Sequence, residues 1–137
     1  MDSQDKVVVF EQFARKAKER LEERKKLHKE TLELESMGGM SMEIRGLSDA
    51  ELNEVFEFSE DAIENDKYAI FFASSTLQEA AKLMVADGSL QVGKEYHITD
   101  MFTQAERRFI ANRILVLSGV NSEPGITIKE TEEVKNF

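Results

Sequence analysis

The sequence predicts a mainly α-helical protein: a small helical domain of about four to five helices with one or two short peripheral strands, preceded by a charged N-terminal helical arm. Residues 11–35 contain neither Gly nor Pro and are rich in Lys, Glu, Arg and Leu, which are good helix formers. Three Ser/Thr-x-x-Glu patterns precede runs with apolar residues every three or four positions. The length of 137 residues suits one domain.

The arm, residues 1–36, is predicted to be a helix with an apolar stripe on its first half. The stripe residues recur at spacings of three or four, namely Phe10, Phe13, Ala14, Ala17 and Leu21. The charged run at 22–26 then interrupts the pattern, so the second half has little to bury. Because an isolated arm has no core of its own, Phe10, Phe13 and Leu21 are predicted to contact a partner or a second copy of the chain.

A Gly-Gly linker is predicted at residues 37–41, because paired glycines stop a helix and leave the backbone flexible. The core domain is then expected over residues 42–120. It opens with a short strand over 42–47, in which Met42 and Ile44 face one side while Glu43 and Arg45 face the other.

Three capping boxes mark predicted helix starts. They are Ser48-x-x-Glu51, Thr76-x-x-Glu79 and Thr103-x-x-Glu106. The first helix is expected to end near Asn65, and Asp87-Gly88 to close the second. Residues 88–99 are expected to form a loop before the third.

Residues 68–73 form the most continuously apolar run and favour a short buried helix, with a strand as the open alternative. Phe71 and Phe72 are adjacent and point about 100° apart in a helix. They are interpreted either as two core anchors or as one anchor and one contact with a partner.

A left-handed residue is expected at Gly119, where the third capped helix ends and Val120 folds back on Leu115. Residues 121–137 form a C-terminal extension. Its residues 126–129, Ile-Thr-Ile-Lys, alternate like a short edge strand.

Signatures of catalysis are lacking, and no catalytic, cofactor-binding or metal-binding residue is predicted. The chain has no cysteine, and no serine stands in a G-x-S-x-G pattern. His28 and His97 lack the neighbouring ligands that metal sites show. Gly38-Gly39 is not followed by a phosphate-loop lysine. The sequence favours a protein that binds other proteins over an enzyme.

The charge of −9 is unevenly distributed: residues 1–36 are neutral, and the remainder carries nine basic against eighteen acidic side chains. An acidic body repels nucleic acid and anionic membranes, so neither is an expected partner. No run of about 20 apolar residues and no signal peptide is evident, which predicts a cytoplasmic protein. Dense acidic helix faces leave one alternative function open, an acidic regulatory or inhibitory protein such as a nucleic-acid mimic.

The chain from Met42 onward resembles the tail assembly chaperones of tailed phages and prophages of Gram-positive hosts, in the contractile-tail branch. The resemblance lies in Met42-Glu43-Ile44-Arg45-Gly46-Leu47-Ser48-x-x-Glu51, Ala73-Ser74-Ser75 before Leu77, Met101-Phe102-Thr103-x-x-Glu106, Ile114-Leu115-Val116-Leu117-Ser118-Gly119-Val120 and Lys135-Asn136. The charged arm departs from the more strand-like start of that family.

The resemblance implies a factor outside the mature virion that binds the tape measure protein and keeps its apolar helices soluble. It also implies help in recruiting tail tube subunits. No cofactor is expected. Self-association into a homo-oligomer stays open, as does docking of the arm on its own body.

Overall fold

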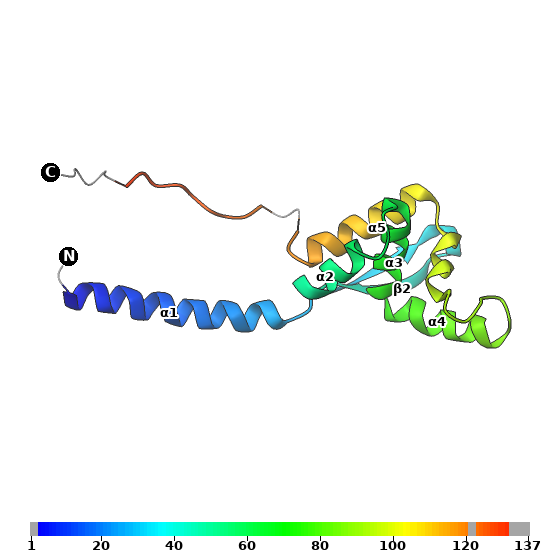
Figure 1. Cartoon of the computed structure of the whole chain (residues 1–137), viewed down its shortest axis with the longest axis horizontal. Coiled ribbons are helices and arrows are strands. Elements are labelled where there is room, and N and C mark those ends of the chain that lie inside the picture. Colours follow the sequence, from blue (N-terminus) through cyan, green and yellow to red (C-terminus); the bar gives the residue numbers. More distant parts are fainter. Residues whose placement is uncertain (1–2, 121–122, 132–137) are drawn as a thin grey trace.

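The computed structural model describes residues 3–120 and 123–131, and it confirms a mainly helical chain with a small antiparallel sheet. A long helix stands off a body in which short helices pack against a two-stranded hairpin (Figure 1). In chain order the elements are α1 (Ser3–Lys25), β1 (Lys29–Leu34), the 3-10 turn η1 (Glu35–Met37), β2 (Met40–Arg45), α2 (Asp49–Phe56), α3 (Ala62–Phe72), α4 (Ser75–Ala86), the 3-10 helix η2 (Glu95–Met101) and α5 (Gln104–Leu117).

The arm helix is shorter than predicted at its C-terminal end. α1 ends at Lys25, and the predicted continuation to Glu35 is wrong because residues 29–34 form β1. In β1, Glu30, Leu32 and Leu34 turn toward the body while the residues between them face solvent. This period of two is the pattern of a strand with one buried face. The arm therefore comprises residues up to about 25, and the body begins at the hairpin.

The predicted Gly-Gly linker is a hairpin turn. Gly38 and Gly39 have φ values of 67° and 83°, which glycine adopts without a Cβ clash, and the Gly39 N–H donates to the Leu34 carbonyl at 2.9 Å. β1 and β2 pair antiparallel from Lys29 with Arg45 to Leu34 with Met40. The two glycines thus join two strands of one domain, and the predicted domain boundary at 37–41 is wrong.

Strand β2 lies at the centre of the core and begins two residues before the predicted strand. Met42 is 1% exposed and Ile44 is fully buried, on the side that was predicted to be apolar. The outer edge of β2 is closed by the junction of α3 and α4. The Arg45 N–H donates to the Ala73 carbonyl at 3.0 Å, and the Ser74 hydroxyl donates to the Glu43 carbonyl at 2.7 Å.

The capping box at Ser48 is confirmed, but the helix that it starts is shorter than predicted. α2 ends at Phe56 rather than near Asn65, and α3 begins after a new N-cap, Asp61. Asn65 lies inside α3 and bridges back to the turn, because its side chain accepts from the Ser59 N–H at 2.8 Å. The short helix predicted over 68–73 is confirmed as the end of α3.

Helix α4 is capped by Ser74 and not by Thr76, so the second predicted capping box is wrong. The Ser74 hydroxyl accepts from the Leu77 N–H at 3.3 Å. Thr76 instead accepts a hydrogen bond from the Glu43 N–H at 3.0 Å. Contact with β2 decides which hydroxyl caps the helix.

Replacing Ser74 by alanine is expected to lower the free energy of unfolding by about 1.5 kcal/mol, because it removes a helix cap and a buried hydrogen bond together. Thr76→Ala removes one hydrogen bond at an exposed residue and is expected to cost less. Urea denaturation of both variants measures the difference. Equal losses, or a larger loss for Thr76→Ala, would contradict this assignment of the cap.

The last helix matches its prediction at both ends. The Thr103–Glu106 capping box opens α5, and Gly119 follows it with φ of 86°. The Val120 N–H donates to the Leu115 carbonyl at 2.8 Å, which is the hydrogen bond of a Schellman motif. The predicted loop at 88–99 is partly wrong, since residues 95–101 form η2.

The C-terminal extension leaves the body on the same side as α1 (Figure 1). Over residues 123–131 it forms neither helix nor strand, so the predicted strand at 126–129 is absent from this described segment. Ile126 and Ile128 are 79% and 90% exposed. The rest of the extension lies outside the described residues.

Candidate protein-binding surface

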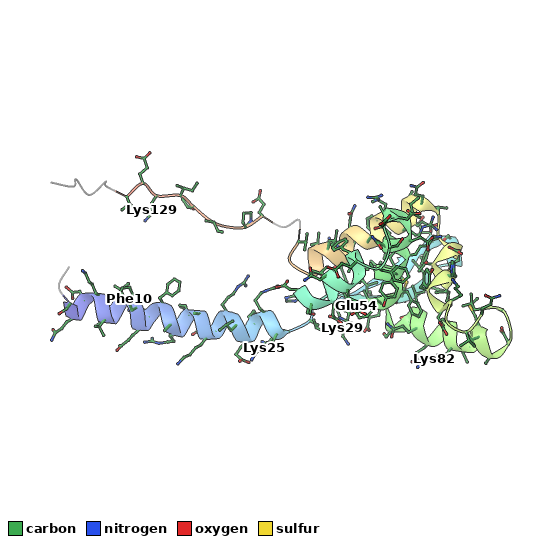
Figure 2. All side chains as sticks on the ribbon, in the orientation of Figure 1. Phe10, Lys25, Lys29, Glu54, Lys82 and Lys129 are labelled. Atoms are coloured by element: carbon green, nitrogen blue, oxygen red, sulfur yellow. The ribbon has the colours of Figure 1, made fainter. Side chains whose placement is uncertain are left out.

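The apolar stripe of α1 is uncovered. Phe10, Phe13 and Leu21 are 68%, 75% and 62% exposed, and no described side chain of α1 is buried. Figure 2 shows the side chains of α1, Phe10 among them, standing clear of the body. Large exposed apolar side chains that are grouped on one helix face mark an interaction surface. The three residues predicted to contact a partner thus lie free on one element.

Charges around the stripe are sorted by sign. At 100° per residue, five of the seven basic side chains of α1 lie within about 85° of the stripe, and all five acidic ones lie about 100° or more from it. The basic neighbours are Lys6, Lys18, Arg20, Arg24 and Lys25. An apolar face bordered by cations fits a partner whose apolar surface is bordered by anions.

The base of α1 is held to the body. The Arg24 guanidinium lies 3.7 Å from the Asp49 carboxylate at the start of α2. After the helix, the His28 carbonyl accepts from the Gly46 N–H at 2.8 Å. The three residues between α1 and β1 are therefore fixed at their far end.

A groove of about 530 Å³ lies between β1 and α5. Its lining comprises Thr31, Leu32, Glu33, Leu34, Glu35, Ser36, Ala105, Glu106, Phe109 and Ile110. Phe109, which is 62% exposed, is the one aromatic side chain among these lining residues. Five of the ten lining residues are apolar, three are carboxylates and none is basic. The groove is therefore apolar with an anionic border.

Two contacts hold the groove walls together. The Arg113 guanidinium on α5 donates to the Glu30 carboxylate on β1, with Nε to Oε1 at 3.1 Å. The Ser36 hydroxyl donates to the Glu106 carboxylate at 2.8 Å. The Thr103 backbone N–H, followed by the Ser36 hydroxyl, lowers the pKa of Glu106, so this border charge is present at neutral pH. The groove is preformed.

Phe71 and Phe72 do not belong to the α1 surface. Both are partly buried against the core at the end of α3. The Phe72 ring lies 5.9 Å from the Tyr68 ring, with the Arg45 guanidinium 5.6 Å from its centre. Their placement matches the core-anchor interpretation in part, and a partner contact through either ring stays a prediction.

A polar cluster ties α3 to η2. Lys67 forms ion pairs with Asp100 at 2.9 Å and Glu64 at 3.2 Å, and the His97 Nδ1 lies 3.1 Å from Asp100. Hydrogen bonding from Lys67 lowers the pKa of Asp100. In the part of the chain that the structure describes, no three His, Asp or Glu side chains gather as metal ligands. The pairing of these charges accounts for the cluster as a structural tie.

Sequence reasoning missed the groove, because its two walls are about 70 residues apart in the chain. One signal was present: Leu32 and Leu34 alternate with Glu33 and Glu35, which is a strand pattern inside a segment that composition favoured as helix. No helix within the described residues is long and apolar enough to cross a membrane. Comparison with protein-family models, with curated proteins and with solved structures finds no match to this chain.

Proposed function

We propose that this protein is a phage tail assembly chaperone that binds the tape measure protein through α1, keeps it soluble and helps recruit tail tube subunits without joining the mature virion. The observation that carries the proposal is the uncovered stripe of Phe10, Phe13 and Leu21 on a helix with no buried residue. A tape measure chain presents long apolar helices before a tube encloses them, and such helices need temporary cover.

Support from the resemblance comes from the body. Its carrying segments form β2 with the start of α2, the α3–α4 junction, the end of η2 with the start of α5, and the end of α5, while Lys135-Asn136 lies outside the described residues. Hydrogen bonds join three of these regions: the Leu47 N–H donates to the Ser118 hydroxyl at 2.8 Å, and the Ser74 hydroxyl donates to the Glu43 carbonyl. The shared pattern therefore describes a packing unit, and α1 is the part that this chain adds.

The acidic body has a role in the same proposal. Residues 29–137, from the hairpin onward, carry a net charge of −11, which keeps a loaded complex soluble through repulsion between complexes. The apolar helix and the anionic body thus divide two tasks, client binding and solubility.

Co-expression with the proposed client, the tape measure protein that the proposal expects to be encoded next to this chain, tests the function. We expect the chain to keep that protein in the soluble fraction, and Phe10→Glu with Phe13→Glu to return its solubility to the level without the chain. Both side chains are exposed, so the double variant is expected to fold. Leu83→Glu on α4, at a residue that is 72% exposed, is the matched control and should leave the soluble fraction unchanged.

Two results would contradict the proposal. One is an unchanged soluble fraction when the chain is omitted. The other is full activity of the double variant with retained helicity, which would remove α1 from client binding.

A further inference from the structure

We propose that α1 of one molecule lies in the groove between β1 and α5 of a second copy, so that two copies exchange their N-terminal helices. The two surfaces are the uncovered apolar stripe and the apolar groove, and each lacks a cover within the described chain. The inference concerns the protein without a client, and it is independent of the function proposed above.

Charge selects the groove as the site for α1. The stripe is bordered by cations on both sides, and the groove is bordered by Glu33, Glu35 and Glu106. Two α1 helices that paired with each other would bring cation borders together, which is unfavourable. A helix placed in the groove instead faces carboxylates with its basic border.

The C-terminal extension fits the groove less well. Ile126 and Ile128 are exposed, but the described segment 123–131 carries Glu123 and Glu130 against one basic residue, Lys129. A negative segment is repelled by the carboxylates of the groove border. Charge complementarity therefore favours α1 over the extension.

Geometry favours a second copy over the same chain. The groove lies at the turn end of β1, about 17 Å from Lys29 at 3.3 Å per residue, and α1 departs at the other end of this strand. In this outward arrangement the Gly46 N–H donates to the His28 carbonyl just after α1, and Arg24 in the last turn of α1 pairs with Asp49. If α1 folded back into the groove of its own chain, at least the Arg24–Asp49 pair would break. Exchange between two copies keeps both contacts.

Exchange also makes a closed assembly. A helix of about 34 Å that reaches from each body into the other forms two identical contacts about a two-fold axis, so neither the stripe nor the groove is left open for a third copy. The expected species is a dimer of twice the chain mass of 15.6 kDa. A client helix would then compete with the groove of the neighbouring copy for the stripe of α1.

The test measures the mass of the full chain alone, by light scattering on a sizing column across micromolar concentrations. We expect a dimer. Phe13→Glu in the stripe and Phe109→Glu in the groove should each raise the dissociation constant roughly 30-fold or more, since each removes an aromatic anchor. Leu83→Glu is the matched control with an exposed apolar residue away from the groove, and it should remain dimeric. Circular dichroism checks that every variant is folded.

Charge reversal gives a second measurement. Arg20→Glu and Glu35→Lys should each weaken the dimer, and the two together should restore at least part of its affinity, because the opposite charges of the stripe border and the groove border are partly rebuilt with their signs exchanged. Rescue of this kind does not follow from a loss of folding.

Four results would overturn the inference. The first is a monomer at every concentration, and the second is a dimer that Phe109→Glu leaves intact while Phe13→Glu dissociates it. The third is a monomer whose α1 amides are protected from hydrogen exchange by the groove of the same chain. The fourth is a monomer that binds anionic vesicles through Phe13. The second result would show that two α1 helices pair with each other, and the last would show that the stripe of α1 contacts a membrane surface. Because no client is present, failure to dimerise and failure to solubilise a client are separate results.

Discussion

Replacing Gly46 by alanine is expected to lower the free energy of unfolding by about 3 kcal/mol. Gly46 lies where the end of β2 crosses the C-terminus of α5, and a Cβ built there stands 2.5 Å from the Leu117 carbonyl oxygen and 2.8 Å from its carbon. Both atoms belong to the backbone, so no side-chain rotation relieves the overlap. Either the strand or the helix end must move.

Movement at Gly46 also breaks the hydrogen bonds around it. The Gly46 N–H donates to His28, and the next N–H, that of Leu47, donates to the buried Ser118 hydroxyl. The same substitution is therefore expected to loosen the base of α1. Urea denaturation measures the loss, and protease sensitivity between residues 25 and 29 reports the loosening.

Gly88→Ala is the control for the loss of glycine itself. Gly88 has φ of 84° with no atom within 4 Å of a built Cβ, so only backbone strain opposes alanine there, at about 1 kcal/mol. A loss at Gly46 no larger than the loss at Gly88 would show that β2 and α5 are not in close contact.

Replacing Glu51 by glutamine is expected to cost about 2.5 kcal/mol at neutral pH. Arg45 donates to both carboxylate oxygens of Glu51, at 3.0 and 2.9 Å, and the Ser48 N–H donates to the same group at 3.0 Å. The hydrogen bonds from Arg45 hold the pKa of Glu51 at about 2 instead of 4.5. Burial opposes this shift, and the Ser48 N–H adds a smaller lowering effect. This difference corresponds to about 3 kcal/mol before screening by solvent at the one-quarter-exposed side chains.

The pH dependence has a definite sign. Because the pKa is lower in the folded chain, Glu51 stabilises the fold fully above pH 4.5, and this contribution disappears as the pH falls toward about 2. The stability of Glu51→Gln should therefore approach that of the unmodified chain over this interval. Chemical denaturation at several pH values measures the difference, and a gap that stays constant between pH 5 and pH 2.5 would contradict the role assigned to the ion pair.

Local signals predicted the helical part of the fold well. Ser48, Thr103 and Gly119 act within four residues of themselves, through a hydroxyl, a carboxylate or a left-handed glycine. The predicted stripe of α1 lies exposed on one helix for the same reason, since its spacing depends on the helix alone. Partner binding by these side chains remains a prediction.

Signals that depend on distant residues were misread. Residues 29–34 are good helix formers by composition, yet they form a strand because pairing with 40–45 buries Leu32 and Leu34. Ser74 takes the cap from Thr76 because the Glu43 carbonyl and N–H, 31 and 33 residues away, bind one hydroxyl each.

The sequence by itself determined the helical class, the start and end of α5, the start of α2 and the apolar face of α1, because each follows from interactions within a few turns of one segment. Only the tertiary structure decided that the Gly-Gly pair turns a hairpin, that α1 ends at Lys25 and that β1 and α5 enclose an anionic-bordered groove. Those features require segments about 10 to 70 residues apart to meet, and the free energy of such contacts depends on the whole core.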